Sequence, residues 1–74
     1  PNRVHRIGDG PLQFYPPGMD IKVYDVNGRY IDTVQVDAKW DCTNTYGEKV
    51  TAGVYVYVAE DGKGFRETGR LVLK

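Results

Sequence analysis

Residues 20–36 read DIKVYDVNGRYIDTVQV, two runs rich in branched and aromatic side chains on either side of Asn27-Gly28. In the first run, Ile21 and Val23 alternate with polar or tyrosine residues, which is the period of a strand with one buried face. Asn-Gly between two such runs is the strongest short hairpin signal. It predicts a two-residue type I′ turn, in which both residues have positive φ. The stretch therefore predicts a β-hairpin.

The rest of the chain favours an all-β fold. Its 74 residues include ten valines and six tyrosines but only three each of alanine, leucine and glutamate. Branched and aromatic side chains fit a pleated sheet and lose freedom in helices. The predicted strands cover residues 12–15, 20–26, 30–36, 39–41, 54–59 and 65–73, with residues 1–10 left mostly irregular. Six or seven short antiparallel strands at about ten-residue spacing predict a small immunoglobulin-like β-sandwich.

The core is predicted from the most apolar strand, VYVYVA at residues 54–59, and from its expected neighbours. Its valines are expected to face the second sheet and its tyrosines to line the other side. Trp40 is expected to bridge the two sheets. The predicted core residues are Ile21, Val23, Val34, Trp40, Val54, Val56, Val58 and Leu71. Residues 12–15 are expected at a sheet edge, because two prolines follow them, and residues 65–73 are expected there too.

Composition excludes several functions. The chain has no serine, one histidine (His5) and one cysteine (Cys42), so it has no serine nucleophile, intrachain disulfide or multi-Cys or multi-His zinc site. Ten basic residues balance ten acidic ones, so we expect no nucleic-acid partner. No apolar run approaches the roughly 20 residues of a membrane helix, so we expect no membrane insertion. No cofactor is expected.

A few residue groups are candidate sites, and each has a structural alternative. Cys42 would need His5 as the base for nucleophilic catalysis, whereas a lone loop cysteine is usually incidental. The oxygens of Asp37, Asp41, Asn44 and Glu48 are weak calcium candidates, although such side chains usually bond their own backbone. The sugar-platform candidates are Tyr24, Tyr30, Tyr46, Tyr55, Tyr57 and Trp40. The basic cluster is Lys63, Arg66, Arg70 and Lys74, interpreted as a solvated edge. The predicted turn residues are Asn27, Gly28, Gly47 and Gly53.

Five sequence strings carry a resemblance to a known family. They are IKVYDVNGR (21–29), WDCTN (40–44), GEKV (47–50), GVYVY (53–57) and GRLVLK (69–74). In this order and spacing, the chain resembles the FlgD-type immunoglobulin-like domain, named for the flagellar hook-capping protein. Many such domains overlap in pattern with C-terminal sorting domains of the type IX secretion system. The resemblance covers residues 8–74. Two departures are Cys42, where the family has glycine, and a shorter connection before Trp40.

The resemblance implies a non-catalytic C-terminal module of a larger secreted or cell-surface bacterial protein. We expect residues 1–10 to form a lead-in or linker and residues 11–74 to form the domain. The expected partners are an upstream domain of the same protein or neighbouring subunits, and an export or surface-attachment machinery. One alternative is a capping or filament subunit of an extracellular or flagellar hook assembly. Another is a small carbohydrate-binding module.

Overall fold

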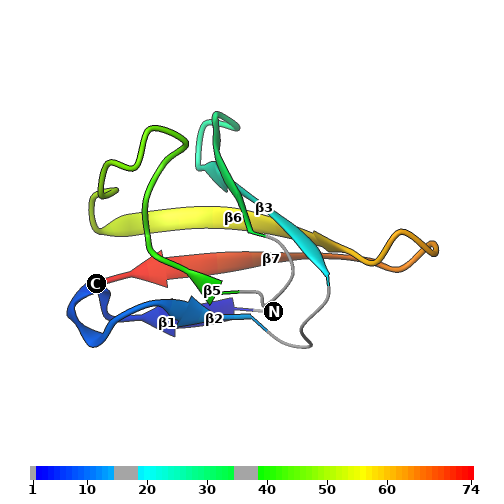
Figure 1. The fold of residues 1–74 in the computed structure, drawn as a ribbon, viewed down its shortest axis with the longest axis horizontal. Helices are drawn as coiled ribbons and strands as arrows, with labels where there is room; N and C mark the ends of the chain where they lie inside the picture. The colour runs from blue at the N-terminus through cyan, green and yellow to red at the C-terminus, as the bar shows by residue number, and fades with distance from the viewer. Residues whose placement is uncertain (1, 15–18, 35–38) are drawn as a thin grey trace.

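The computed structural model describes residues 2–14, 19–34 and 39–74, which form seven strands in two sheets (Figure 1). The strands are β1 (Asn2–His5), β2 (Leu12–Gln13), β3 (Asp20–Asp25), β4 (Tyr30–Val34), β5 (Lys39–Trp40), β6 (Gly53–Glu60) and β7 (Arg66–Leu73). A single-turn 3-10 helix, η1 (Ile7–Asp9), follows β1. No helix in these ranges is long and apolar enough to cross a membrane. The predicted all-β class is confirmed.

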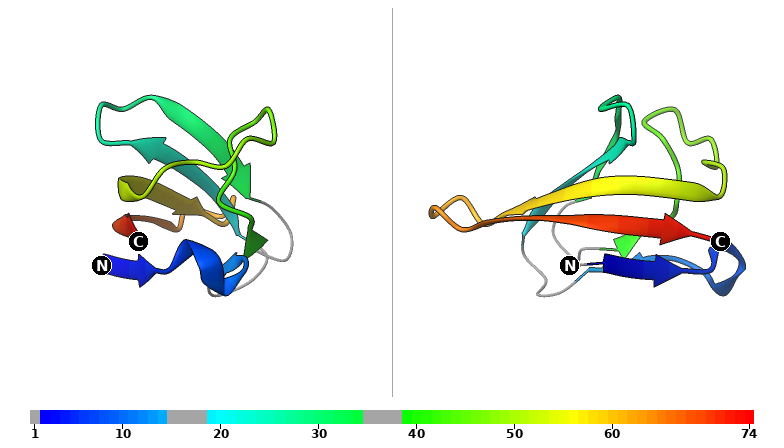
Figure 2. Two further views of the ribbon diagram at one scale, coloured as in Figure 1. Left: turned by 90° about the vertical axis from the view of Figure 1, so that its left-hand side faces the viewer. Right: turned by 180° about the vertical axis from the view of Figure 1, so that it is seen from behind.

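The two sheets differ in size. The larger has the order β1-β7-β6-β3-β4, and the smaller pairs β2 with β5. β6 is the central strand of the large sheet and pairs over its whole length with β7. Figure 2 shows the small sheet lying across one face of the large sheet, with no other described element on the opposite face. The core therefore lies between the small sheet and one face of the large one.

The first residues of the chain belong to the large sheet, which corrects the prediction that they are mostly irregular. β1 pairs with β7, from Asn2↔Arg70 to His5↔Leu73. This pairing is parallel, so the sheet is not purely antiparallel as predicted. Beyond the strands, Lys74 N donates to His5 O and Ile7 N donates to Lys74 O, at 2.9 and 2.8 Å. β1 and η1 are thus fastened to the end of β7.

β7 is consequently an interior strand, and its prediction as an edge is wrong. Its neighbours are β1 on one side and β6 on the other. The edges of the large sheet are β1 and β4 instead. The basic residues Arg66 and Arg70 lie on this interior strand, so they do not form the predicted solvated edge. Both remain exposed because they point to the face that the small sheet leaves open.

The central strand β6 turns its tyrosines inward, the reverse of the prediction. Tyr55 and Tyr57 are 7% and 2% exposed, while the three valines between and beside them are only half-buried. The predicted core positions Val54, Val56 and Val58 are therefore wrong. An aromatic ring buries more apolar area than a valine side chain, so the tyrosine face gains more from the interior.

The hydroxyl groups of both inward tyrosines have hydrogen-bond partners, so burial of these side chains leaves neither hydroxyl without a partner. Tyr55 Oη donates to Thr51 O at 2.7 Å, and Arg3 Nε donates to Tyr57 Oη at 3.3 Å. The Arg3 guanidinium also lies 5.7 Å from the Tyr57 ring centre and 5.5 Å from that of Phe14. β1 therefore contributes a cation to the core margin, a role that its sequence did not reveal.

Trp40 joins the two sheets. It lies in β5 of the small sheet, is 2% exposed, and contacts Tyr55 of the large sheet with ring centres 6.4 Å apart. Its indole Nε1 donates to Thr43 O at 3.0 Å, so its polar atom is satisfied. The buried hydrophobic residues of the described ranges are Leu12, Phe14, Met19, Ile21, Val23, Val34, Trp40, Cys42, Tyr55, Tyr57, Ala59, Leu71 and Leu73.

Candidate functional site

Cys42 and His5, the pair that nucleophilic catalysis would need, have separate surroundings. Cys42 is 1% exposed and packs within the core cluster. His5 lies in β1, where its ring Nε2 donates to Gly10 O at 2.8 Å. Burial raises the pKa of the Cys42 thiol; nearby Lys49 lowers it and Asp41 raises it further. A buried thiol with a raised pKa is a poor nucleophile at neutral pH.

The backbone at Cys42 keeps the left-handed conformation that a glycine would favour. Its φ is +59°, the sole positive φ among the described non-glycine residues. The side chain is buried here, so burial offsets the cost of this backbone region, which is about 1–2 kcal/mol for an ordinary residue. The cysteine at this position therefore still has the left-handed backbone conformation that glycine favours.

Substitutions at Cys42 should separate backbone strain from burial. We expect Cys42→Val to lower the free energy of unfolding by about 1–3 kcal/mol, because a β-branched residue is poorly tolerated at positive φ. Cys42→Gly should change it by less than about 1 kcal/mol, since lost burial and relieved strain offset each other. Urea denaturation of both variants measures this. A valine variant as stable as the parent would contradict it.

Asn44 and Glu48, two of the calcium candidates, use their side-chain oxygens within the loop. Asn44 Oδ1 accepts hydrogen bonds from Tyr46 N and Glu48 N, at 2.9 and 3.0 Å, and its Nδ2 donates to Glu48 Oε1. The backbone oxygen of Asp41 accepts from Lys49 Nζ, which places a cation beside the loop. Asp37 lies outside the described residues. No group of three or more His, Cys, Asp or Glu side chains in the described ranges could hold a metal ion.

We expect this loop to be independent of metal. The Asn44 side chain already accepts hydrogen bonds from the backbone N–H groups of this loop. Removal of calcium should therefore leave the melting temperature unchanged. Thermal unfolding followed by circular dichroism, with a chelator and with added calcium, is the measurement. A rise of several degrees with calcium that disappears in Asp41→Ala would show a site that this geometry does not predict.

The candidate sugar-binding aromatics do not form one platform. Trp40, Tyr55 and Tyr57 are buried in the core. Tyr24 and Tyr30 contact each other on the large sheet, with ring centres 5.9 Å apart, and they pair in register across β3 and β4. Tyr46 is 86% exposed in the loop after β5. The six candidates therefore do not form a common sugar-binding platform, although Tyr55 and Tyr57 share one face of β6 as expected.

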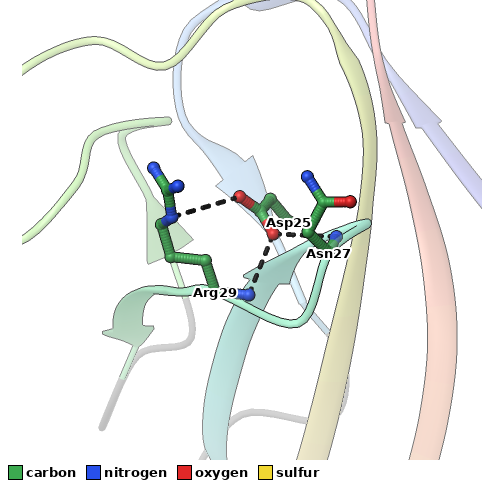
Figure 3. Close-up of polar contacts among 3 residues, drawn as sticks. All are labelled: Asp25, Asn27 and Arg29. Carbon is green, nitrogen blue, oxygen red and sulfur yellow. Dashed lines mark hydrogen bonds and ion pairs between the residues drawn. The ribbon is translucent and has the colours of Figure 1, made fainter.

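The hairpin turn after β3 is built around Asp25 and not around a type I′ Asn-Gly pair (Figure 3). Asp25 Oδ1 accepts from Asn27 N and Arg29 N, both at 2.9 Å. Gly28 N donates to Asp25 O, and only Gly28 has a positive φ, +83°. This is a three-residue loop with glycine at the left-handed position. The prediction of two positive φ values is therefore wrong.

The same turn occurs three times, a regularity that the sequence analysis missed. In each copy an Asp or Asn oxygen accepts from the backbone N–H groups two and four residues later, and a glycine with positive φ stands three residues later. The copies begin at Asp25, Asn44 and Asp61. The signal is Asx-X-X-Gly, where a short side chain replaces a backbone acceptor. It bonds one side-chain oxygen in each of three loops to the loop backbone.

Asp25→Ala tests the importance of this turn. Loss of two hydrogen bonds from backbone N–H groups to a carboxylate should lower the free energy of unfolding by about 1–2 kcal/mol. The Arg29–Asp25 ion pair, at 3.9 Å with Arg29 mostly exposed, should matter little. Arg29→Ala is thus the matched control, expected within about 0.5 kcal/mol of the parent. Equal losses in both urea titrations would assign the effect to the ion pair.

Taken together, the described residues form two packed sheets, and one Asp or Asn side chain in each of three loops is bonded to its loop backbone. What such a domain offers to other molecules is its surface: the open face of the large sheet and the edges of β1 and β4. Backbone groups at a sheet edge can pair with a further strand.

Two solved structures share this architecture. Part of PorZ, an essential surface component of the type IX secretion system of Porphyromonas gingivalis, superposes with a TM-score of 0.59 and 23% identity. Part of dimeric latent PorU from the same organism superposes with a TM-score of 0.52 and 24% identity. The matches cover 88% and 86% of this chain but only 11% and 8% of those chains. At such identities they establish a common fold. No protein-family model and no curated protein matches the sequence.

Proposed function

We propose that this chain is a non-catalytic, C-terminal immunoglobulin-like module of a larger exported bacterial protein, and that the type IX secretion system recognises it. The observation that carries the proposal is the fold match with a domain-sized part of PorZ, which is itself a surface component of that system. The five strings that resemble FlgD-type domains support the same assignment from sequence, because many such domains overlap in pattern with type IX sorting domains. The module would therefore act at the cell surface.

The physical character of the domain fits recognition better than chemistry. The candidate nucleophile Cys42 is buried with a raised pKa, and one Asp or Asn side chain in each of three loops is bonded to the loop backbone. A partner would therefore meet an exposed face or an edge strand. The large sheet has two such edge strands. One is β4, which pairs with β3 in the antiparallel direction, and the other is β1, which pairs with β7 in the parallel direction.

A reporter fusion tests the proposal. The chain is fused behind a periplasmic reporter protein that carries an export signal, and the fusion is expressed in Porphyromonas gingivalis. We expect the reporter to become accessible to a protease added outside intact cells. The matched control replaces the chain with an unrelated β-sandwich of similar size and should remain protected. Equal protection of both fusions would contradict the proposal.

A further inference from the structure

The turn between β3 and β4 places an asparagine directly before a glycine, Asn27 before Gly28, and both residues are exposed. In Figure 3, the backbone nitrogen of Asn27 contacts Asp25, whereas the Asn27 side-chain amide is joined to neither Asp25 nor Arg29. A Cβ atom at Gly28 would meet no other atom within 4 Å. A side-chain amide therefore lies beside a backbone nitrogen that no side chain of its own residue shields.

This pair of residues has the atoms that deamidation requires. After its proton passes to water or hydroxide, the Gly28 nitrogen can attack the side-chain carbon Cγ of Asn27. The new N–Cγ bond closes a five-membered succinimide ring, and the Cγ–Nδ2 bond breaks as the leaving nitrogen takes up a proton and departs as ammonia. Water then opens the ring at either carbonyl, which gives aspartate or isoaspartate. Water is consumed and ammonia is released, with no oxidant or reductant.

The closed turn opposes this reaction. Gly28 N donates to Asp25 O at 3.0 Å, and this bond holds the proton that must be lost. The two central residues of the turn have negative φ, as in a type I turn, so the ψ of Asn27 is near about 0°. That angle places the Gly28 nitrogen beside the backbone nitrogen of Asn27 and away from its Cβ, whereas ring closure needs the nitrogen beside Cβ. The turn must therefore open before the ring can form.

We propose that Asn27 is a modification site that deamidates when this turn opens, and that the hydrogen bonds to Asp25 control the rate. Isoaspartate adds its Cβ atom to the main chain between positions 27 and 28. Gly28 N and Arg29 N then cannot both reach the two Asp25 oxygens that they contact in the parent, so the product does not re-form the native turn. The inference is independent of the proposed export role.

Asn44 provides a comparison within the same chain. It begins the second copy of the same turn, but its side chain is held there: Nδ2 donates to Glu48 Oε1 at 2.9 Å, and Oδ1 accepts from two backbone N–H groups of the loop. The residue after it is Thr45, whose branched side chain hinders approach to its nitrogen. The remaining asparagine, Asn2, lies in β1 and is not followed by glycine. We therefore expect modification mainly at Asn27.

Incubation of the 74-residue chain in mildly alkaline buffer at physiological temperature, followed by peptide mapping with mass spectrometry, tests the proposal. We expect the mass increase of deamidation in the peptide that contains Asn27. At Asn44 and Asn2 the reaction should be at least about tenfold slower, which needs only a small difference in activation barrier. A methyltransferase specific for isoaspartate should label the same peptide as the mass increase. A parent chain in which Asn27 reacts no faster than Asn44 overturns the proposal.

Variants of the turn test the role of Asp25. Asp25→Ala should raise the rate at Asn27 about five- to thirtyfold, because loss of the hydrogen bonds raises the population of the open turn. Arg29→Ala is the matched control: it keeps the backbone bond to Asp25 Oδ1 and should react at the rate of the parent. Asn27→Gln keeps an amide but would need a larger ring, so its peptide should show no mass increase.

Circular dichroism checks that each variant folds. If Asp25→Ala does not fold, Asp25→Asn decides instead, because its neutral amide oxygen is a weaker acceptor than a carboxylate, and its rate at Asn27 should also exceed that of the parent. A folded Asp25 variant that reacts at the rate of the parent overturns the proposal.

Discussion

Replacing Trp40 with alanine should lower the free energy of unfolding by about 3–5 kcal/mol. The ring is 2% exposed and contacts Tyr55 across the two sheets. Since the small sheet consists of only β2 and β5, this ring and Phe14, which follows β2, are aromatic contacts that hold it against the large sheet. A loss of this size is a large share of the total stability of a small domain. The variant should therefore be largely unfolded near physiological temperature.

Thermal and urea unfolding of Trp40→Ala beside the parent measure this effect. Tyr46→Ala is the matched control, because it also removes an aromatic ring but from a side chain that is 86% exposed. We expect the control to stay within about 0.5 kcal/mol of the parent. A Trp40→Ala protein that melts within a degree or two of the parent would contradict the assignment of Trp40 as the residue that joins the two sheets.

Tyr57→Ala should be nearly as damaging, at about 3–5 kcal/mol. Tyr57 is 2% exposed, its ring centre lies 5.3 Å from that of Phe14, and its hydroxyl accepts from Arg3 Nε. The substitution removes a core ring and leaves the Arg3 guanidinium with one ring fewer to contact. Tyr57→Phe, which keeps the ring, should cost only about 1 kcal/mol for the lost hydrogen bond.

The neighbouring residue Val56 provides the sharpest comparison for Tyr57. It lies one position earlier on the opposite face of β6 and is half-buried. Val56→Ala should cost about 1 kcal/mol, because less apolar area leaves the interior. Urea titration of Tyr57→Ala and Val56→Ala therefore reads out which face of β6 is inside. A larger loss for Val56→Ala would restore the orientation that the sequence pattern predicted.

The sequence pattern predicts that β6 is a strand, but it does not predict which of its two faces lies inside. Alternation in VYVYVA predicts a strand with two distinct faces, but both faces are apolar and the period does not rank them. The choice depends on what each face meets: Trp40 and Phe14 pack against the tyrosine rings. The inner face of β3 is predicted directly by its sequence pattern, because the buried residues Ile21 and Val23 alternate with the charged residue Lys22.

The beginning of the chain was missed for a related reason. In β1, Arg3 and His5 share the face that turns toward the core margin, and Val4 points to the open face. The scattered basic residues of this segment therefore predict an irregular lead-in and do not indicate a strand. The strand forms because β7 offers a long edge for parallel pairing and because Arg3 contacts Phe14 and Tyr57. Both causes depend on residues far along the chain.

The prediction of candidate sites failed for the same reason: the spacing of residues in the sequence does not show which groups they contact. Spacing brought Asp41, Asn44 and Glu48 together as oxygen donors, but the structure uses Asn44 and Glu48 within the loop itself. The Asx-X-X-Gly signal was available in the sequence and would have predicted this use.

The most direct test of the export role is the location of the reporter fusion in two strains, one competent for type IX secretion and one lacking PorZ. PorZ is an essential component of that system, so its loss should block only cargo that the system carries. We predict that extracellular protease digests the fused reporter in the competent strain and that the reporter stays inside the cell envelope without PorZ. A reporter that reaches the surface equally in both strains would contradict recognition of this domain by the type IX system.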